Sequence, residues 1–275
     1  MEPLAPLPRP SAPPPPPRSL GAILDAALDL LRRHWVLLVG LCALVQIPAA
    51  FAEAALSDEG STRDLASDHP WLAAALLFSV LAVPVVTAAV TDACGEFLHG
   101  RTTDAGRALR RGLALAPRLV VTGLVLLLLT VVAALPLAAV AQGGAALGPA
   151  RGPALVLAAA LLLLVVVRFA LLTQVVVLER RWGPAALVRA SRLISGQVLR
   201  VVAVYLVAGL LMGLIGAVAG LALADLPVFA PVAIGFVQAL AFAYTSAVGV
   251  VLYEDVRVRR GEADGPGPLT PRAGA

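Results

Sequence analysis

Six separate stretches of this 275-residue chain are long and apolar enough to cross a lipid bilayer as helices. The hydrocarbon core of a bilayer is about 30 Å thick, and a helix crosses it with roughly 20 apolar residues. Leucine, valine and alanine dominate these stretches without the alternation that a β-barrel strand shows. The sequence therefore predicts an all-α fold with six transmembrane helices. They cover about residues 35–56, 71–95, 117–141, 153–178, 198–224 and 227–253.

The composition excludes a water-soluble domain. Hydrophobic residues make up 60% of the chain and charged residues 14%, against about half and about a quarter in ordinary globular proteins. No soluble fold of this length has enough interior for so many apolar side chains. All 21 basic residues are arginine, so a GxxxxGK phosphate-binding loop and a Schiff-base lysine are excluded as well.

The distribution of arginine predicts how the chain threads through the membrane. Cytoplasmic loops of membrane proteins are enriched in basic residues. Eighteen arginines lie in the two terminal segments and in the loops after the second and fourth spans, whereas Arg63 and Arg151 lie on the other side. We therefore expect both termini in the cytoplasm. The proline-rich segment 1–18 and the segment 257–275 are expected to be disordered tails.

The segments before the first, third and fifth spans each carry an amphipathic helical pattern. In the first, apolar residues recur every three or four positions over residues 20–31, and Ser19 is the expected N-cap. Similar patterns begin at Thr103 and Pro184. Such helices are expected to lie as elbows in the headgroup layer. Their arginines that we expect to contact anionic headgroups are Arg32, Arg33, Arg110, Arg111, Arg189 and Arg192.

Equal spacing predicts a threefold internal repeat. The outward spans begin near Trp35, Pro117 and Leu199, with 82 residues between successive starts. Each unit would contain an elbow helix, an outward span, an outer loop and an inward span. Alternatively, any membrane protein made of hairpins with arginine-rich inner loops would show this pattern. The expected membrane domain covers residues 19–256, with units of about 19–99, 100–181 and 182–256.

Arg168 is a charged residue inside the fourth span. A guanidinium group there costs at least a few kcal/mol unless it is paired or reaches the headgroups along its own stem. Asp92, at a comparable depth in the second span, is the carboxylate that we expect to pair with it. Arg168 is open to two interpretations, a binding site for an anionic substrate or headgroup and a purely structural group.

Further polar side chains occupy the middle or cytoplasmic halves of the inward spans. If three units surround one axis, these groups would line a cavity open to the cytoplasm. Otherwise they form hydrogen bonds between helices. With Arg168 and Asp92, the candidate polar site comprises Thr91, Thr173, Gln174, Gln238 and Thr245.

Four glycines of the fifth span share one face of the helix. Gly209, Gly213, Gly216 and Gly220 lie within about 60° of one another. A flat stripe of this kind lets another helix approach closely. We expect it to pack within the chain, in preference to forming the seam of a homo-oligomer.

Two stretches of the chain resemble a known membrane family. They read SLGAILDAALDLLRRHW over residues 19–35 and VLERRWGPAALVRASRLISG over residues 177–196. Both resemble the membrane domain found beside bacterial glycerophosphoryl diester phosphodiesterases and its stand-alone relatives, over about residues 18–256. The resemblance implies a bacterial inner-membrane protein. It supplies no catalytic residues, because the membrane part of that family is not known to contribute any.

The sequence shows no catalytic or metal site. His34, His69 and His99 have no accompanying carboxylate cluster that would hold a divalent metal. We therefore expect a scaffold or accessory module for lipid handling or for an envelope or transport machine, without cofactors or nucleic acid. Anionic lipids and a membrane protein partner or second copy are its expected partners. The alternative is a transporter or permease subunit with a cytoplasm-facing cavity around Arg168.

Overall fold

The computed structural model describes residues 18–59, 70–142, 151–223 and 229–262, and all the regular elements in these ranges are α-helices. Six candidate spans are long and apolar enough to cross a membrane, as predicted. The chain is therefore an all-helical, multi-pass membrane protein. Its helices are α1 (Leu20–Arg33), α2 (Trp35–Glu59), α4 (Pro70–Leu98), α5 (Ala105–Gln142), α7 (Arg151–Arg168), α8 (Leu172–Leu178), α9 (Pro184–Ile194), α10 (Val198–Leu223) and α11 (Ala230–Arg259).

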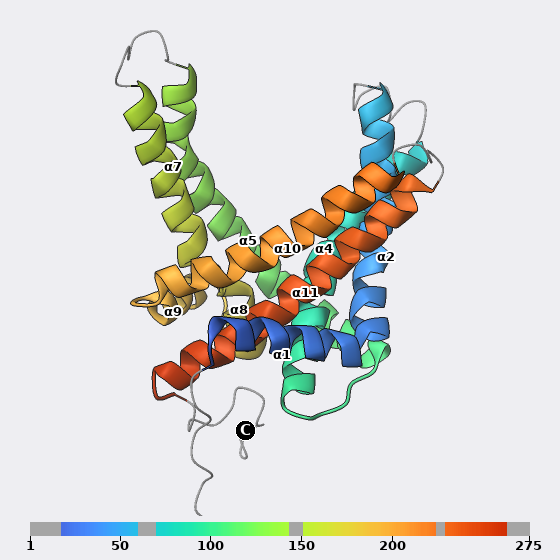
Figure 1. Cartoon of the computed structure of the whole chain (residues 1–275), viewed down its shortest axis with the longest axis horizontal. Helices are drawn as coiled ribbons and strands as arrows, with labels where there is room; N and C mark the ends of the chain where they lie inside the picture. Colours follow the sequence, from blue (N-terminus) through green and yellow to red (C-terminus); the bar gives the residue numbers. More distant parts are fainter. Residues whose placement is uncertain (1–17, 60–69, 143–150, 224–228, 263–275) are drawn as a thin grey trace, which may run out of the picture.

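The long helices form two groups that diverge from a shared base (Figure 1). One group is the hairpin of α5 and α7, and the other contains α2, α4, α10 and α11. The base, where the groups meet, contains α1, α8 and α9. The contact between α2 and α11 is the most extensive, while α4 packs against both α2 and α5. The α2–α4 and α10–α11 hairpins therefore lie together, whereas the α5–α7 hairpin diverges from them. The threefold repeat stays a prediction.

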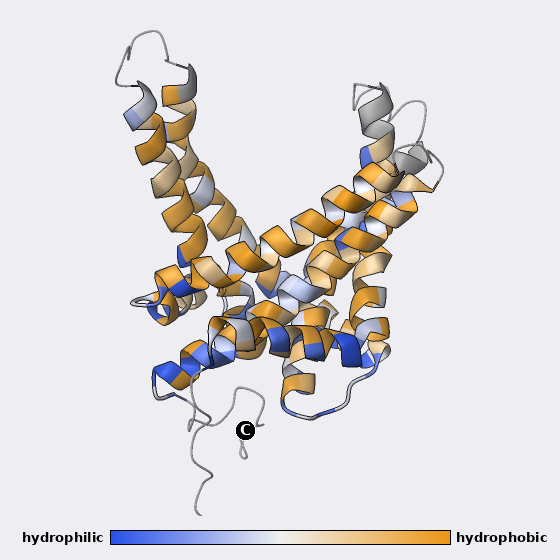
Figure 2. Cartoon of the chain, viewed as in Figure 1, coloured by the Kyte–Doolittle hydropathy of each residue, from blue (hydrophilic) through white to orange (hydrophobic). Residues whose placement is uncertain are grey.

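Hydropathy separates the base from the rest of the molecule (Figure 2). Hydrophilic residues gather on α1, on α9 and at the end of α11, whereas the diverging helices are mostly apolar. Large apolar side chains on these helices are exposed, including Leu157 at 73% and Leu221 at 81%. An apolar surface of this extent requires a lipid environment, as the composition indicated.

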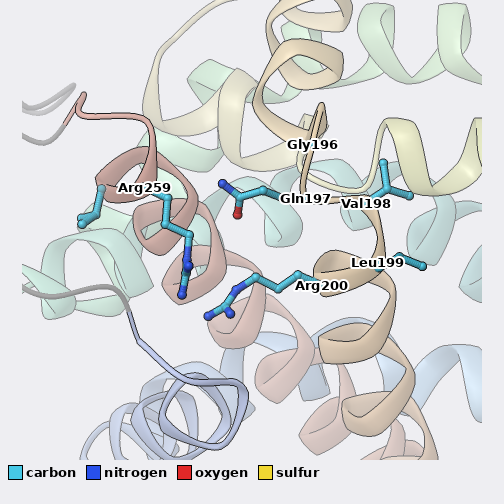
Figure 3. Close-up of a pocket in the computed structure, with 7 residues that line it drawn as sticks. Gly196, Gln197, Val198, Leu199, Arg200 and Arg259 are labelled. Carbon is cyan, nitrogen blue, oxygen red and sulfur yellow. The ribbon is translucent and has the colours of Figure 1, made fainter.

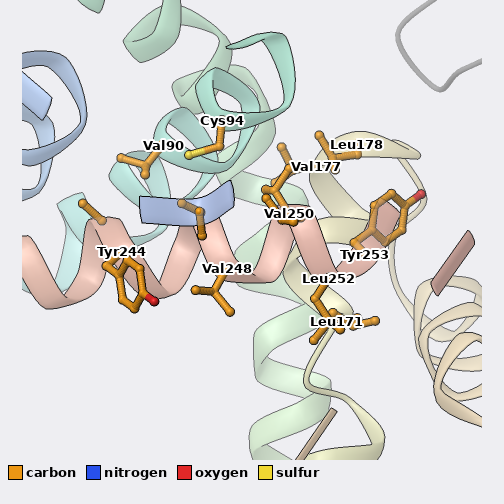
Figure 4. Close-up of a cluster of buried hydrophobic side chains, with 14 of the residues drawn as sticks. Val90, Cys94, Leu171, Val177, Leu178, Tyr244, Val248, Val250, Leu252 and Tyr253 are labelled. Carbon is orange, nitrogen blue, oxygen red and sulfur yellow. The ribbon is translucent and has the colours of Figure 1, made fainter. Parts of the chain in front are cut away.

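The core lies where the two groups join (Figure 4). Fully enclosed side chains from α4, α8 and α11 meet there, among them Val90, Leu178 and Tyr253. Cys42 and Cys94 are both buried and free. The enclosed side chains are therefore concentrated near the base, whereas many apolar side chains on the far parts of the helices are exposed.

Two close helix contacts depend on glycine. A Cβ atom on Gly112 of α5 would clash with the carbonyl oxygen of Val85 on α4. A Cβ atom on Gly235 of α11 would lie 2.7 Å from the Cα atom of Ile47 on α2. Only glycine allows the backbones to approach this closely.

The predicted glycine stripe packs differently from our expectation. A Cβ atom on Gly209, Gly213 or Gly220 would meet nothing within 4 Å, and one on Gly216 would meet only Val237 Cγ1, at 4.0 Å. The prediction that the stripe packs closely within the chain is therefore wrong for the described residues. Spacing places the glycines on one face of α10, but it does not determine which way that face points.

Two of the three amphipathic segments are separate helices. The Oγ atom of Ser19 accepts a hydrogen bond from the backbone N–H of Ala22 (3.2 Å), so the predicted N-cap of α1 is confirmed. The α9 helix begins at Pro184, as predicted, after a turn at Gly183 with a φ of +63°. The second segment is instead continuous with the third span in the 38-residue α5, which contains Pro117 in its interior.

The end of α11 corrects the predicted boundary of the C-terminal tail. The helix runs to Arg259, so residues 257–259, which we assigned to the tail, are helical. Arg257 is buried, and its guanidinium donates to Glu254 and to the carbonyl of Glu262. The remaining tail predictions, for residues 1–17 and 263–275, lie outside the described residues.

Candidate functional site

Asp92 pairs with Arg111 of α5, so the predicted pair between Asp92 and Arg168 is wrong. Arg111 Nη1 lies 3.1 Å from Asp92 Oδ2 and 2.9 Å from Glu96 Oε1. The start of α5 before the third span brings Arg111 against the last turns of α4, where both carboxylates are buried. Arg111, which we predicted as a headgroup contact, is therefore also the partner of two buried acidic groups.

Arg168 is the last residue of α7, and the chain turns at residues 169–171 before α8. The 18 residues of α7 extend about 27 Å, close to the full thickness of the hydrocarbon core. Arg168 therefore lies at the base end of α7, while the apolar stretch of the fourth span continues beyond it through α8 to Leu178. It forms no ion pair within the part of the chain that the structure describes.

The other predicted polar residues make separate contacts. Gln174 of α8 and the Tyr205 hydroxyl of α10 both lie against Gly249 of α11, and the Tyr205 hydroxyl donates to the carbonyl oxygen of Ala170 (3.4 Å). Gln238 of α11 donates to Glu53 of α2 (3.4 Å). These contacts connect neighbouring helices at different places, which is the interhelical hydrogen bonding that we considered as the alternative to a cavity.

The three predicted threonines do not extend this network into a cavity. Thr245 donates to the carbonyl of Ala241 in its own helix (2.7 Å). Thr91 is buried in α4 and Thr173 is half-buried in α8. Within the described ranges, no charged or amide side chain among the seven predicted site residues forms a hydrogen bond or ion pair with another member of the set.

Three of the six predicted headgroup arginines have carboxylate partners. They are Arg111, Arg33, which pairs with Asp29 at the surface (2.8 Å), and Arg189. Arg32, Arg110 and Arg192 are exposed and form no ion pair within the described ranges. These three are the predicted arginines that stay available for headgroups.

Arg189 belongs to a network that fastens α9 to α8 and α11. Its Nε atom donates to both oxygens of Glu179 (2.9 and 3.0 Å), and its Nη1 atom donates to Glu262 (3.1 Å). The Tyr253 hydroxyl donates to the same Glu179 (2.8 Å). The hydrogen bonds from Arg189 lower the pKa of Glu262, and the two carboxylates raise the pKa of Arg189. Arg181 also pairs with Glu179 (3.3 Å), so the network joins the α8–α9 connection to α9 and α11.

A second cluster, around Asp255, leaves positive charge without a partner. The enclosed carboxylate of Asp255 accepts from Arg200 Nη2 (3.0 Å), Arg259 Nε (2.9 Å) and the backbone N–H of Arg18 (2.7 Å). Arg200 and Arg259 also both donate to the carbonyl oxygen of Arg18. Two guanidinium groups thus share one carboxylate. The cluster of Arg200, Arg259 and Asp255 therefore carries a net positive charge.

These two arginines line a cavity of about 860 Å³, which we call the basic pocket (Figure 3). It is bounded by residues 196–200 at the start of α10 and by Val258 and Arg259 at the end of α11. The side chains of Gln197, Arg200 and Arg259 converge on the same space (Figure 3). Arg200 Nε and Gln197 Oε1 are buried without a hydrogen-bond partner among the described residues.

The frame of the basic pocket is fixed by the ends of α9 and α11. Gly196, with a φ of +83°, makes the turn between α9 and α10. Arg260 donates to the carbonyl oxygens of Leu193 (3.2 Å) and Ser195 (2.7 Å) at the end of α9. Because its walls are held by these bonds, the pocket presents its arginine donors in a defined geometry, which suits a phosphate or carboxylate group.

A smaller cavity of about 170 Å³ lies beside the Asp92 cluster. Arg111, Arg118 and Arg180 line it together with Asp92. Arg118 and Arg180 form no ion pair in the part of the chain that is described. The base therefore carries a second concentration of positive charge, between α5 and the segment that joins α8 to α9.

Sequence reasoning missed the basic pocket. The sequence analysis counted Arg200 and Arg259 only among the arginines of the predicted cytoplasmic segments, and it assigned no role to Asp255. One available signal was the spacing of Asp255 and Arg259, which places opposite charges one helical turn apart at the end of the last span. The pairing of Asp255 with Arg200 had no such signal, because it depends on how α10 and α11 meet.

Among the described residues there is no group of three or more His, Cys, Asp or Glu side chains that could hold a metal ion. The comparisons with known proteins give no family model, curated protein or solved structure that matches this chain. The resemblance to the phosphodiesterase-associated membrane domain therefore stays a prediction.

Proposed function

We propose that this chain is a bacterial inner-membrane scaffold or accessory module that binds anionic lipid headgroups at its base and has no catalytic centre of its own. The observation that carries the proposal is the basic pocket, where Arg200 and Arg259 share the single carboxylate of Asp255. The pocket lies at the end of the molecule where the apolar helices finish and the hydrophilic residues gather. Headgroup phosphates occupy that level of a membrane.

The amphipathic helices support this placement. α1 lies along the base and packs against α11, with Ile23, Ala27 and Leu31 buried and Arg32 exposed. α9 likewise buries one face and exposes Arg192 on another. In our proposal both are elbow helices in the cytoplasmic headgroup layer, both termini are cytoplasmic, and the three hairpins derive from a threefold repeat. A lipid-handling, envelope or transport machine would be the partner of such a module.

The alternative, a transporter with a polar cavity around Arg168, has less support. Arg168 lies at the end of α7, and the other predicted polar residues make separate helix contacts. No described observation favours it over headgroup binding.

The proposal is tested by lipid retention. The full chain is purified in detergent with equal amounts of phosphatidylglycerol and phosphatidylcholine, and bound lipids are counted by native mass spectrometry. We expect preferential retention of phosphatidylglycerol, weakened by the double variant Arg200→Gln/Arg259→Gln. The matched control Arg33→Gln/Arg107→Gln removes two surface charges that pair within their own helical segments (Arg33 with Asp29, Arg107 with Asp104). Equal retention of the two lipids by the unmodified chain would refute the proposal.

A further inference from the structure

The cavity of about 170 Å³ beside Asp92 is bounded by segments that lie far apart in the sequence. Arg111 and Arg118 are seven residues apart on α5, so they lie within about 20° of each other around the helix. Arg180 lines the same cavity from the connection between α8 and α9. Three guanidinium groups from two parts of the chain therefore surround one small space.

A single threonine hydroxyl joins the two sides of this cavity. The Thr122 hydroxyl donates to the carbonyl oxygen of Arg118 (2.7 Å) and accepts a hydrogen bond from the backbone N–H of Gly183 (3.0 Å). Thr122 is fully buried. Arg180 has a φ of +55° and is the only non-glycine residue with a positive φ in the described ranges, a conformation that residues with a side chain rarely adopt. The backbones that carry Arg118 and Arg180 are therefore held in place relative to one another.

The two carboxylates at the cavity are balanced by two arginines. Asp92 and Glu96 share Arg111, and Glu96 also pairs with Arg101 (2.5 Å). Arg111 forms both of its ion pairs through Nη1. Its Nε and Nη2 atoms form no hydrogen bond within the described ranges, so they are available to donate to a further group.

Arg118 and Arg180 supply the charge that is not balanced. Both residues are exposed, and their side chains form no ion pair or hydrogen bond with any residue that the structure describes. The cavity thus has two positive charges in excess. A phosphate monoester carries about 1.5 to 2 negative charges at neutral pH, whereas a phosphodiester carries one. Charge complementarity therefore favours the monoester.

We infer that this cavity, which we call the Arg118–Arg180 site, binds a phosphate monoester dianion. Guanidinium groups bind phosphate oxygens through paired, charge-assisted hydrogen bonds. The volume is below the roughly 300–1,000 Å³ of pockets that enclose drug-sized ligands, so the site takes the phosphate group and leaves the rest of the ligand outside. The inference goes beyond the proposed function, because this site shares no residue with the basic pocket.

A bound phosphate would connect two parts of the fold. The hairpin of α5 and α7 diverges from the other long helices (Figure 1), and the phosphate would join Arg118 of this hairpin to Arg180 of the α8–α9 connection. A ligand that binds only the folded protein raises its stability. Occupancy is therefore measurable both as retained ligand and as a higher midpoint of thermal unfolding. The phosphate group can come from a lipid, such as phosphatidic acid, or from free phosphate.

The first arm of the test uses lipid. Dioleoyl phosphatidic acid and dioleoyl phosphatidylglycerol have the same acyl chains and differ in the charge of the phosphate. Both are added in equal amounts to the full chain in detergent and counted by native mass spectrometry. We expect phosphatidic acid to be preferred, and Arg118→Gln/Arg180→Gln to weaken its binding by about tenfold, a change of about 1.4 kcal/mol.

The matched control is Arg110→Gln/Arg192→Gln. It removes two exposed arginines, one from α5 and one from α9, that do not line the cavity and form no ion pair within the described ranges. This control should leave the preference for phosphatidic acid over phosphatidylglycerol unchanged. Both double variants remove exposed charges without a described carboxylate partner, so their unfolding midpoints without ligand should match that of the unmodified chain.

The second arm uses inorganic phosphate, compared with chloride at equal ionic strength. If free phosphate is the ligand, it raises the unfolding midpoint of the unmodified chain and of the control, but not of Arg118→Gln/Arg180→Gln. If the ligand is a lipid, added phosphatidic acid raises the midpoint in the same variant-dependent way and inorganic phosphate does not. Either result supports the site and identifies its source of phosphate.

Two results would overturn the inference. Equal retention of phosphatidic acid and phosphatidylglycerol by the unmodified chain, with no shift of the midpoint by inorganic phosphate, would refute it without any variant. An equal loss of phosphatidic acid in the two double variants would show that general surface charge, and not this cavity, binds the lipid. The proposed function fails in a different measurement, the comparison of phosphatidylglycerol with phosphatidylcholine.

Discussion

Asp255 of α11 and Arg200 of α10 form an ion pair that closes the open end of the α10–α11 hairpin, with 3.0 Å between Arg200 Nη2 and Asp255 Oδ2. The carboxylate is fully enclosed, whereas the guanidinium keeps part of its surface exposed. Asp255 also holds Arg259, from the next turn of its own helix. One acidic group therefore both joins two spans and orients the donors of the basic pocket.

Asp255→Asn is expected to destabilise the protein because it leaves two guanidinium groups without their shared carboxylate. Removing one partner of a buried ion pair typically costs about 3–5 kcal/mol. The measurement is the midpoint of thermal unfolding in detergent. Asp29→Asn is the matched control, since Asp29 pairs with Arg33 at the surface, where such pairs contribute little. Equal midpoints for the two variants would mean that Asp255 does not anchor the hairpin.

Gly235→Ala should destabilise the contact between α2 and α11, whereas Gly213→Ala should not. The added Cβ atom at position 235 would lie 2.7 Å from Ile47 Cα, while at position 213 it meets nothing within 4 Å. Overpacking of this kind costs about 1–3 kcal/mol. Both variants gain the same helix propensity, so their difference in unfolding midpoint isolates the clash. A lower midpoint for Gly213→Ala than for Gly235→Ala would contradict the packing described above.

Arg111→Gln is expected to lower stability by about 3 kcal/mol, because it removes the cation that Asp92 and Glu96 share. Arg168→Gln, which removes an arginine without an ion pair in the described ranges, should have little effect. Unfolding in a denaturant series, followed by helix content, compares the two. The opposite order would contradict the role of Arg111 as the cation that stabilises these two carboxylates.

Local and bilayer-imposed features could be predicted from the sequence. The number of spans follows from the length of apolar stretches, because the bilayer fixes the length that a helix needs. The start of α1 at Ser19 and of α9 at Pro184 follows from capping and from the preference of proline for the first helical turn. Each of these depends on neighbouring residues alone.

Features that depend on how helices pack could not be predicted in this way. Asp92 was assigned to Arg168 from comparable depth, but the partner is set by the early start of α5, which places Arg111 beside it. The glycines that allow close approach are single ones, such as Gly112 and Gly235, and not the four in a stripe. The spacing of residues in a helix shows which of them lie on the same face. Only the packing of the helices determines what that face contacts.

Acid is expected to weaken the Arg189 network through Glu262. Hydrogen bonds from Arg189 hold the pKa of this carboxyl below its ordinary value of 4.5. A lowered pKa in the folded state contributes stability that is fully present above about pH 4.5 and is lost as the pH falls through the folded-state value. The unfolding midpoint should therefore fall more steeply below about pH 4.5 in the unmodified chain than in Glu262→Gln. Parallel curves would show that the ion pair does not contribute.

Single cysteines introduced at the two ends of the molecule test how it sits in the membrane. The connection between α4 and α5 lies at the base beside α1 (Figure 1). Gly21→Cys and Thr102→Cys should therefore react from one side of the membrane, and Gly152→Cys, at the far end of α7, from the other. All three positions are exposed, and the native Cys42 and Cys94 are buried, so background labelling should be low.

The side of labelling decides the orientation. Because the arginines gather at the base, a membrane-impermeant maleimide should label Gly21→Cys and Thr102→Cys in inside-out vesicles and Gly152→Cys in intact spheroplasts. Labelling of Gly21→Cys and Thr102→Cys from opposite sides would be incompatible with the described fold. Labelling of both from the outer side would keep the fold and reverse the orientation. The basic pocket would then face the outer leaflet, and the proposed cytoplasmic headgroup contact would be wrong.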